Sequence, residues 1–192
     1  MTLPPDARAL AVNLAGWILC AACLPAILAL RSRRAPRNAW LQGLLRFLAV
    51  WGPVAAANWL VGVLCDRLGA GAPPAQDVLR QFADGAPIQR TAIAVCAIFV
   101  MPAVEEWIFR ERLQSWLLRR ISPFRGIVLV AVVFASLHFS LRAFLPLAIL
   151  SGGLSLARLR TGRLLPSIVM HALYNASSLA FLLALGPSAI AS

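Results

Sequence analysis

The chain contains no lysine, only seven acidic residues and only two histidines in 192 residues. Charged residues make up 13% of the sequence, about half of the roughly 25% that a soluble globular domain carries. Hydrophobic residues make up 60%, and the mean hydropathy is +0.79. This composition excludes an ordinary soluble domain, and the length suits a single membrane-embedded bundle.

Because lysine is absent, all 18 basic residues are arginines, and the formal net charge is +11. In a soluble protein such an excess would indicate nucleic-acid binding. Here the arginines form short clusters between apolar runs, and no basic stripe alternates with stacking aromatic residues. The charge pattern therefore favours contact with the lipid bilayer and argues against a nucleic-acid partner.

Cysteine is scarce as well, and its placement argues against a disulfide framework or a zinc ribbon. Cys20 and Cys23 have C-x-x-C spacing, but they lie in an uncharged run, and no second pair follows at zinc-ribbon spacing. That run has 22 residues, more than the roughly 7–15 of a signal-peptide core. We therefore expect four packing cysteines and a first apolar segment that stays in the mature protein.

The apolar stretches predict an all-α fold, a polytopic membrane helix bundle of about six transmembrane helices. An apolar helix of about 20 residues crosses a hydrocarbon core of roughly 30 Å. The predicted spans are residues 9–30, 41–65, 91–104 with its helical continuation, 126–141, 143–157 and 164 to the C-terminus. The chain thus divides into two N-terminal helices (1–65), an irregular outer loop (66–90) and a core of four helices (91–185).

The arginine clusters predict the orientation of these spans, because short cytoplasmic loops collect basic residues. Clusters lie at 31–37, 110–125 and 158–163, whereas the stretch 66–90 balances three arginines with three aspartates. We therefore expect the clusters to face the cytoplasm, and the 66–90 loop and both termini to lie outside. A compact chain rich in Ala, Arg, Gly and Pro suggests a GC-rich bacterial genome and hence the bacterial inner membrane.

Ionisable side chains inside the predicted spans are candidate functional residues, because each costs about 2.5–3.5 kcal/mol to insert into lipid. The two adjacent glutamates, Glu105 and Glu106, follow the third span. Residues four apart share a helix face, so Arg110 is expected to pair with Glu106. Glu105 then points about 100° away around the helix. One glutamate is predicted to be structural and the other free to react.

The only two histidines of the chain fall within the predicted fourth and sixth spans. Each has a partner four residues away on the same helix face: Phe134 precedes His138, and Asn175 follows His171. Two serines extend the second pair into a polar line along an apolar helix. Interhelical hydrogen bonding is the alternative explanation for such a line, and we expect it chiefly for the serines.

Three short motifs therefore occur in order along the chain: Glu105-Glu106-x-x-x-Arg110, Phe134-x-x-x-His138 and His171-x-x-x-Asn175. Together they use both histidines, and they resemble the motifs of the CPBP family of intramembrane proteases. This family, also called the CAAX protease, bacteriocin-processing or Abi family, includes the type II CAAX prenyl endopeptidases. The resemblance covers roughly residues 91–185 and implies an intramembrane endopeptidase.

The resemblance also implies a role for each polar residue. Peptide hydrolysis needs an activated water, a base for its proton and donors for the developing oxyanion. Glu105 is the implied base, and His138 holds the water or passes a proton to the leaving amine. His171 and Asn175 are the implied oxyanion ligands, so no cofactor is needed. The expected substrate is a membrane-embedded or membrane-tethered protein or peptide tail, and a bacterial origin argues against prenylated ones.

A zinc-dependent metalloprotease is an alternative that uses the same residues. Glu105, His138 and His171 are a familiar set of zinc ligands that leaves one position open for water. The H-E-x-x-H motif is absent, however. Asn175 also suits an oxyanion better than it suits zinc, so the glutamate mechanism is preferred.

A non-catalytic scaffold or transporter subunit is the second alternative. The small residues Ser151, Gly152, Gly153 and Ser155 would support close helix packing in an enzyme and in a scaffold alike. A transporter usually shows repeated halves with broken helices at matching positions. The polar residues of this chain are concentrated in the last four predicted spans instead, which argues against two halves.

Overall fold

The computed structural model describes residues 38–69 and 77–186, and this part of the chain is helical, without β-strands. The first predicted span, 9–30, lies outside the described residues. Four described helices are long and apolar enough to cross a membrane: Ala39–Arg67, Pro87–Leu118, Leu141–Thr161 and Leu165–Ala184. The predicted helical membrane bundle is confirmed, and the chain is a multi-pass membrane protein.

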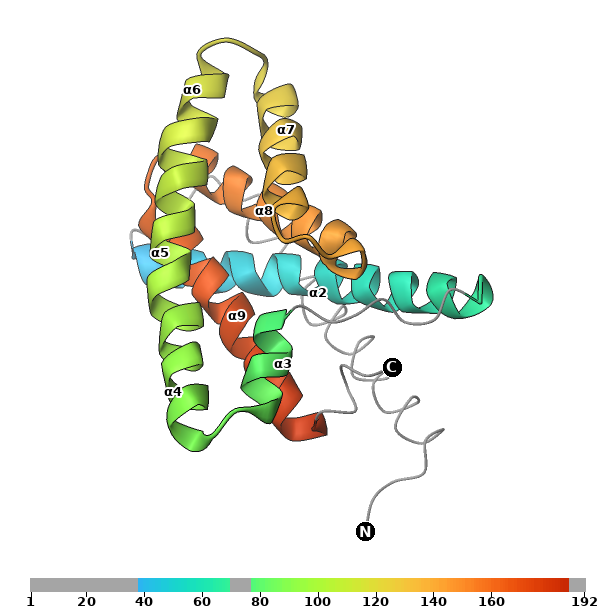
Figure 1. The fold of residues 1–192 in the computed structure, drawn as a ribbon. Coiled ribbons are helices and arrows are strands. Elements are labelled where there is room, and N and C mark those ends of the chain that lie inside the picture. The colour runs from blue at the N-terminus through green and yellow to red at the C-terminus, as the bar shows by residue number, and fades with distance from the viewer. Residues whose placement is uncertain (1–37, 70–76, 187–192) are drawn as a thin grey trace.

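Residues 87–118 form one long helical rod, which stands upright from α4 to α6 in Figure 1. Two π-helical segments interrupt its α-helical ladder. Its parts are α4 (Pro87–Val95), η1 (Cys96–Val100), α5 (Met101–Glu106), η2 (Trp107–Gln114) and α6 (Ser115–Leu118). Such π segments are often found at functional sites, and here they lie on both sides of the two adjacent glutamates.

Helix α7 (Pro123–Ser136) is shorter than the predicted fourth span, 126–141. With 14 residues it is about 21 Å long, less than the roughly 30 Å of a hydrocarbon core. It forms a hairpin with the upper part of the rod (Figure 1). The helix ends early because the chain turns at Phe139, which has φ of 48°, and Ser140 caps the next helix through Ala143 N–H.

The sequence predicted an irregular loop over 66–90, but part of this stretch is helical. It contains α3 (Asp77–Asp84) and the start of α4. The side chain of Phe82 is buried against Leu179 and Leu182 of α9 (Leu165–Leu185). Apolar residues at helical spacing, Leu79 among them, therefore fold this short segment onto the bundle.

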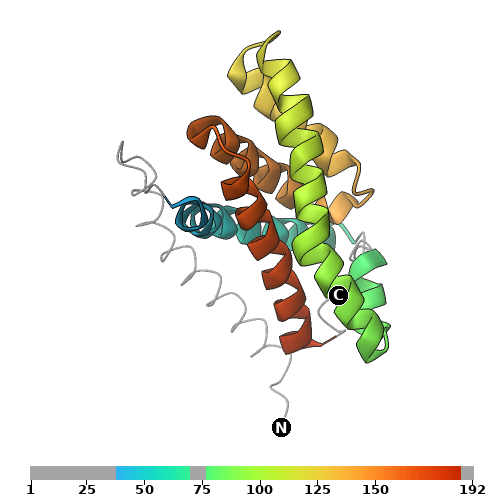
Figure 2. The same cartoon turned by 90° about the vertical axis from the view of Figure 1, so that its left-hand side faces the viewer.

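Helices α2 (Ala39–Arg67), α8 (Leu141–Thr161) and α9 pack closely because glycines line their contacts. A Cβ at Gly153 would lie 2.7 Å from Val50, and a Cβ at Gly43 would lie 2.6 Å from Val169. Figure 2 shows α9 passing between α2 and the rod. This arrangement brings the polar residues of α9 against α5.

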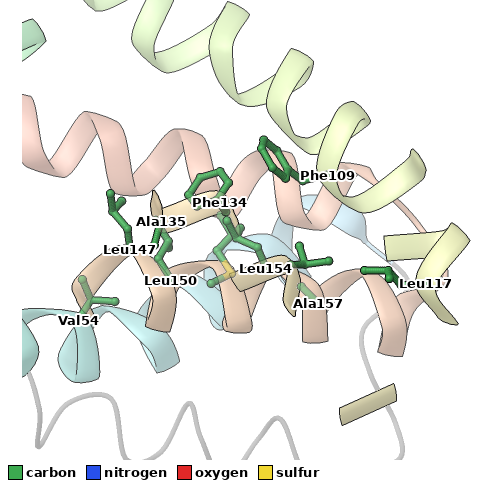
Figure 3. Close-up of a cluster of buried hydrophobic side chains, with 11 residues drawn as sticks. Val54, Phe109, Leu117, Phe134, Ala135, Leu147, Leu150, Leu154 and Ala157 are labelled. Carbon is green, nitrogen blue, oxygen red and sulfur yellow. The ribbon is translucent and has the colours of Figure 1, made fainter. Parts of the chain in front are cut away.

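The main hydrophobic core joins the rod, α7 and α8, and Figure 3 shows it from close by. Its centre is Phe134, which is fully buried and meets Phe109 edge-on with the ring centroids 5.1 Å apart. The other buried members are Val54, Leu117, Val130, Ala135, Leu147, Leu150, Leu154, Ala157 and Met170. Three of the polar residues, His138, His171 and Arg110, lie next to the Phe134 ring of this core.

Candidate active site

A fully buried ion pair lies at the centre of the bundle. The Nη1 atom of Arg110 is 3.1 Å from Oε1 of Glu106, and neither side chain has exposed surface. This pairing confirms the prediction from their spacing. Arg110 also donates from Nη2 to the hydroxyl of Ser151, at 2.8 Å, and to the carbonyl oxygen of the same residue, at 3.3 Å. The pair therefore links the rod to α8.

His171 lies between the two glutamates. Its Nδ1 is 2.9 Å from Oε1 of Glu106, and its Nε2 is 3.7 Å from Oε2 of Glu105. The Glu106 carboxylate accepts the Nδ1 hydrogen, which orients the ring and turns Nε2 toward Glu105. The Glu105 side chain is 20% exposed, whereas that of Glu106 is wholly buried. Only Glu105 of the two is therefore placed to meet a water molecule.

Phe134 lies next to both imidazoles. Its ring centroid is 4.7 Å from that of His138 and 5.8 Å from that of His171. The guanidinium carbon of Arg110 lies 4.8 Å from the centroid of the same ring, a distance typical of a cation–π contact. Phe134, the predicted partner of His138, is thus also the apolar side chain that packs next to the buried ion pair.

His138 lies in the turn after α7 rather than inside a span. Its Nδ1 donates to the carbonyl oxygen of Phe134 at 2.8 Å, which leaves Nε2 free, and the residue is half-buried. Among the described residues, no hydrogen bond or ion pair joins His138 to Glu105 or His171. The structure therefore brings His138 to the same phenyl ring as His171 but not into direct contact with the glutamates.

Asn175 is bonded to the backbone of the rod. Its Nδ2 donates to the carbonyl oxygen of Ala97, in η1, at 2.7 Å. That carbonyl lacks a helical partner, because Met101 N–H bonds Cys96 instead and Pro102 has no N–H. The asparagine predicted to bind an oxyanion thus uses one of its two amide hydrogens to hold η1 against α9.

The partners of this site on α8 were not predicted from the sequence. Ser151 was expected only to favour packing, yet it accepts a hydrogen bond from Arg110. Gln114 is also fully buried, and its Nε2 donates to the carbonyl oxygen of Ser155 at 3.0 Å. The signal was present in the spacing, because Gln114 stands four residues after Arg110 and Ser155 four after Ser151.

The proposed zinc ligands do not form a three-ligand set. Glu105 and His171 are close, but His138 contacts Phe134 instead. Within the described residues, no group of three His, Cys, Asp or Glu side chains is arranged to hold a metal ion. The arrangement supplies instead a partly exposed carboxylate beside an oriented imidazole, which suits general acid–base chemistry.

Similarity to known proteins and protein families gives independent information about this chain. Neither a curated protein nor a solved structure matches the chain. Residues 87–177 match the family described as Type II CAAX prenyl endopeptidase Rce1-like, which agrees with the CPBP resemblance of the three motifs. The matched stretch runs from the first residue of α4 past Asn175 in α9. Residues 87–177 are therefore similar to the CAAX protease family, and this similarity supports an intramembrane endopeptidase in general.

Proposed function

We propose that the chain is a glutamate-dependent intramembrane endopeptidase in which Glu105 activates the attacking water. The observation that carries this proposal is the position of His171 between a partly exposed Glu105 and a buried Glu106, whose Oε1 is bound to both Arg110 and His171. A general base must reach its proton at hydrogen-bond distance, directly or through one water. Glu105 meets this requirement, whereas the buried Glu106 is bound to Arg110 and His171.

In the proposed reaction, Glu105 takes one proton from water, and the resulting hydroxide attacks the carbonyl carbon of the scissile peptide bond. The Nε2–H of a protonated His171 and the second amide hydrogen of Asn175 bind the oxyanion. The proton taken up by Glu105 then passes through Nε2 of His138 to the leaving amine as the C–N bond breaks, which returns Glu105 to its carboxylate form. Water is thus divided between the new carboxyl and amine groups, and no cofactor takes part.

The proposed substrate is a membrane-embedded or membrane-tethered protein or peptide tail that reaches the site from the bilayer. The long helices of the chain leave most of their apolar surface uncovered, with only 11–39% of each span buried. A hydrophobic tail that binds this surface stays in surroundings as apolar as the lipid chains. We place the protein in the bacterial inner membrane, with its three arginine clusters in the cytoplasm.

The three glutamates of the chain provide a matched test. Glu105→Gln should abolish peptide cleavage in detergent or proteoliposomes, because the neutral amide cannot accept the proton. Glu111→Gln is the control: this side chain lies on the same rod, 42% exposed, and pairs with Arg158. It should keep near-normal activity. Equal activity of the two variants would refute the assignment of the base.

A second experiment identifies the substrate. The inactive Glu105→Gln protein is purified from native membranes, and its bound peptides are identified by mass spectrometry. Enrichment of a hydrophobic segment over the Glu111→Gln control would define the substrate class. Recovery of the same peptides with both variants would argue against a trapped substrate.

A further inference from the structure

A second charged site lies near the beginning of α2. Arg46 is 7% exposed, and its Nε is buried without a hydrogen-bond partner. The residue is thus almost wholly enclosed, and only a small part of its surface is exposed. An unpaired buried charge is costly in free energy unless something outside the chain neutralises it.

A charge of the same sign acts electrostatically on Arg46. It belongs to Arg160, an exposed residue near the end of α8. The packing explains this proximity, because Val50 contacts Gly153 where α2 crosses α8. From that contact, Arg46 lies about one turn back along α2. Arg160 lies about two turns forward along α8. Two guanidinium groups therefore share one end of the helix pair.

No carboxylate of the described residues balances these two arginines. The acid at this end of α8 is Glu111, and it is already engaged by Arg158, with Nη2 and Oε2 2.8 Å apart. Neither Arg46 nor Arg160 forms an ion pair within the described part of the chain. Among the described residues, the positive charges of these two arginines thus remain unbalanced by an ion pair.

We propose that Arg46 and Arg160 bind the phosphate of an anionic phospholipid between α2 and α8. Guanidinium groups match phosphate oxygens in charge and in hydrogen-bond geometry. Arg46 lies seven residues, about 10 Å, from the start of its helix. This depth is close to a membrane surface, where basic pockets between helices bind lipid headgroups. The site is separate from the glutamates and does not depend on the proposed catalysis.

The test measures lipid binding by the full chain in detergent, with phosphatidylglycerol, phosphatidylcholine and inorganic phosphate as three separate probes. Phosphatidylglycerol should raise the thermal unfolding midpoint and remain bound in native mass spectra. Arg46→Gln and Arg160→Gln should each weaken its binding about tenfold, since each removes a charged hydrogen-bond donor. Arg67→Gln, an exposed arginine at the opposite end of α2, is the matched control and should bind normally.

Without lipid, Arg46→Gln should be at least as stable as the wild-type chain, because it removes an uncompensated charge. If that variant fails to fold, the exposed Arg160→Gln still tests the site. Unchanged phosphatidylglycerol binding by Arg160→Gln, or equal binding of phosphatidylcholine by the wild type, would overturn the proposal. Full competition by equimolar inorganic phosphate would assign the site to soluble phosphate and overturn the lipid.

Discussion

The Nδ1 of His171 lies 2.9 Å from Oε1 of Glu106, and that same oxygen is 3.1 Å from Nη1 of Arg110. One carboxylate oxygen thus holds α9 and the rod together. It also fixes the direction in which the imidazole presents Nε2. The position of the imidazole beside Glu105 therefore depends on Glu106, its neighbour in the sequence.

This arrangement predicts that Glu106→Gln mainly costs stability. Loss of one partner leaves Arg110 buried without its counter-charge, which typically costs about 3–5 kcal/mol. Thermal or denaturant unfolding in detergent measures the loss. The matched Glu105→Gln variant should unfold within about 1 kcal/mol of the wild type while losing at least about 10²–10⁴-fold in cleavage rate. If the stability loss falls on Glu105→Gln instead, the two roles are reversed.

A second prediction concerns Asn175 and Pro102. Asn175→Ala should destabilise the chain by about 1–3 kcal/mol, because the Ala97 carbonyl then loses its hydrogen bond. Pro102→Ala restores an N–H five residues after Ala97, which offers that carbonyl a partner within its own helix. On the Pro102→Ala background, the cost of Asn175→Ala should therefore shrink.

A double-mutant cycle on unfolding free energies checks this coupling. We expect an interaction of about 1 kcal/mol between the two positions, within the range found for residues that share a partner. Additive effects of the two substitutions would show that Asn175 does not substitute for the missing proline N–H.

Much of this site could be predicted because it depends on local spacing. The four-residue interval between Glu106 and Arg110 was sufficient to predict their pair. The hydrogen bond from His171 to Glu106 could not be predicted in this way, because it joins residues 65 positions apart. Contacts of this kind depend on how α9 crosses the rod, and no local pattern encodes that crossing.

Helix boundaries were the weakest part of the sequence analysis. The apolar run continues through His138, so its hydropathy predicts a helix where the chain actually turns. The turn depends on a positive φ at Phe139 and a cap by Ser140, and such single-residue signals are weak beside a long apolar pattern. The helix α3 was missed for the opposite reason, because the flanking glycines and prolines of 66–90 obscured a short amphipathic segment.

A third prediction separates the glutamate mechanism from zinc catalysis. Protein stripped with a strong chelator in detergent should keep its cleavage activity and contain no stoichiometric zinc, because the proposed mechanism needs only Glu105 to activate the water. Metal analysis and the cleavage assay are made on the same samples. Activity that is lost on chelation and restored by zinc would favour the metalloprotease. About one zinc per chain, lost in both His138→Ala and His171→Ala, would identify the ligands.

The last prediction concerns orientation in the membrane. Short loops rich in arginine stay in the cytoplasm, and the turn between α6 and α7 carries Arg119, Arg120 and Arg125 near its ends. On a cysteine-free background, Ser122→Cys should therefore resist a membrane-impermeant thiol reagent in intact cells and react after lysis. Asp84→Cys, at the end of α3, should react in intact cells, because the rod separates the two positions by about 50 Å along its axis. Labelling of Ser122→Cys from outside, with protection of Asp84→Cys, would invert the orientation, and it would move the basic site at Arg46 to the outer leaflet.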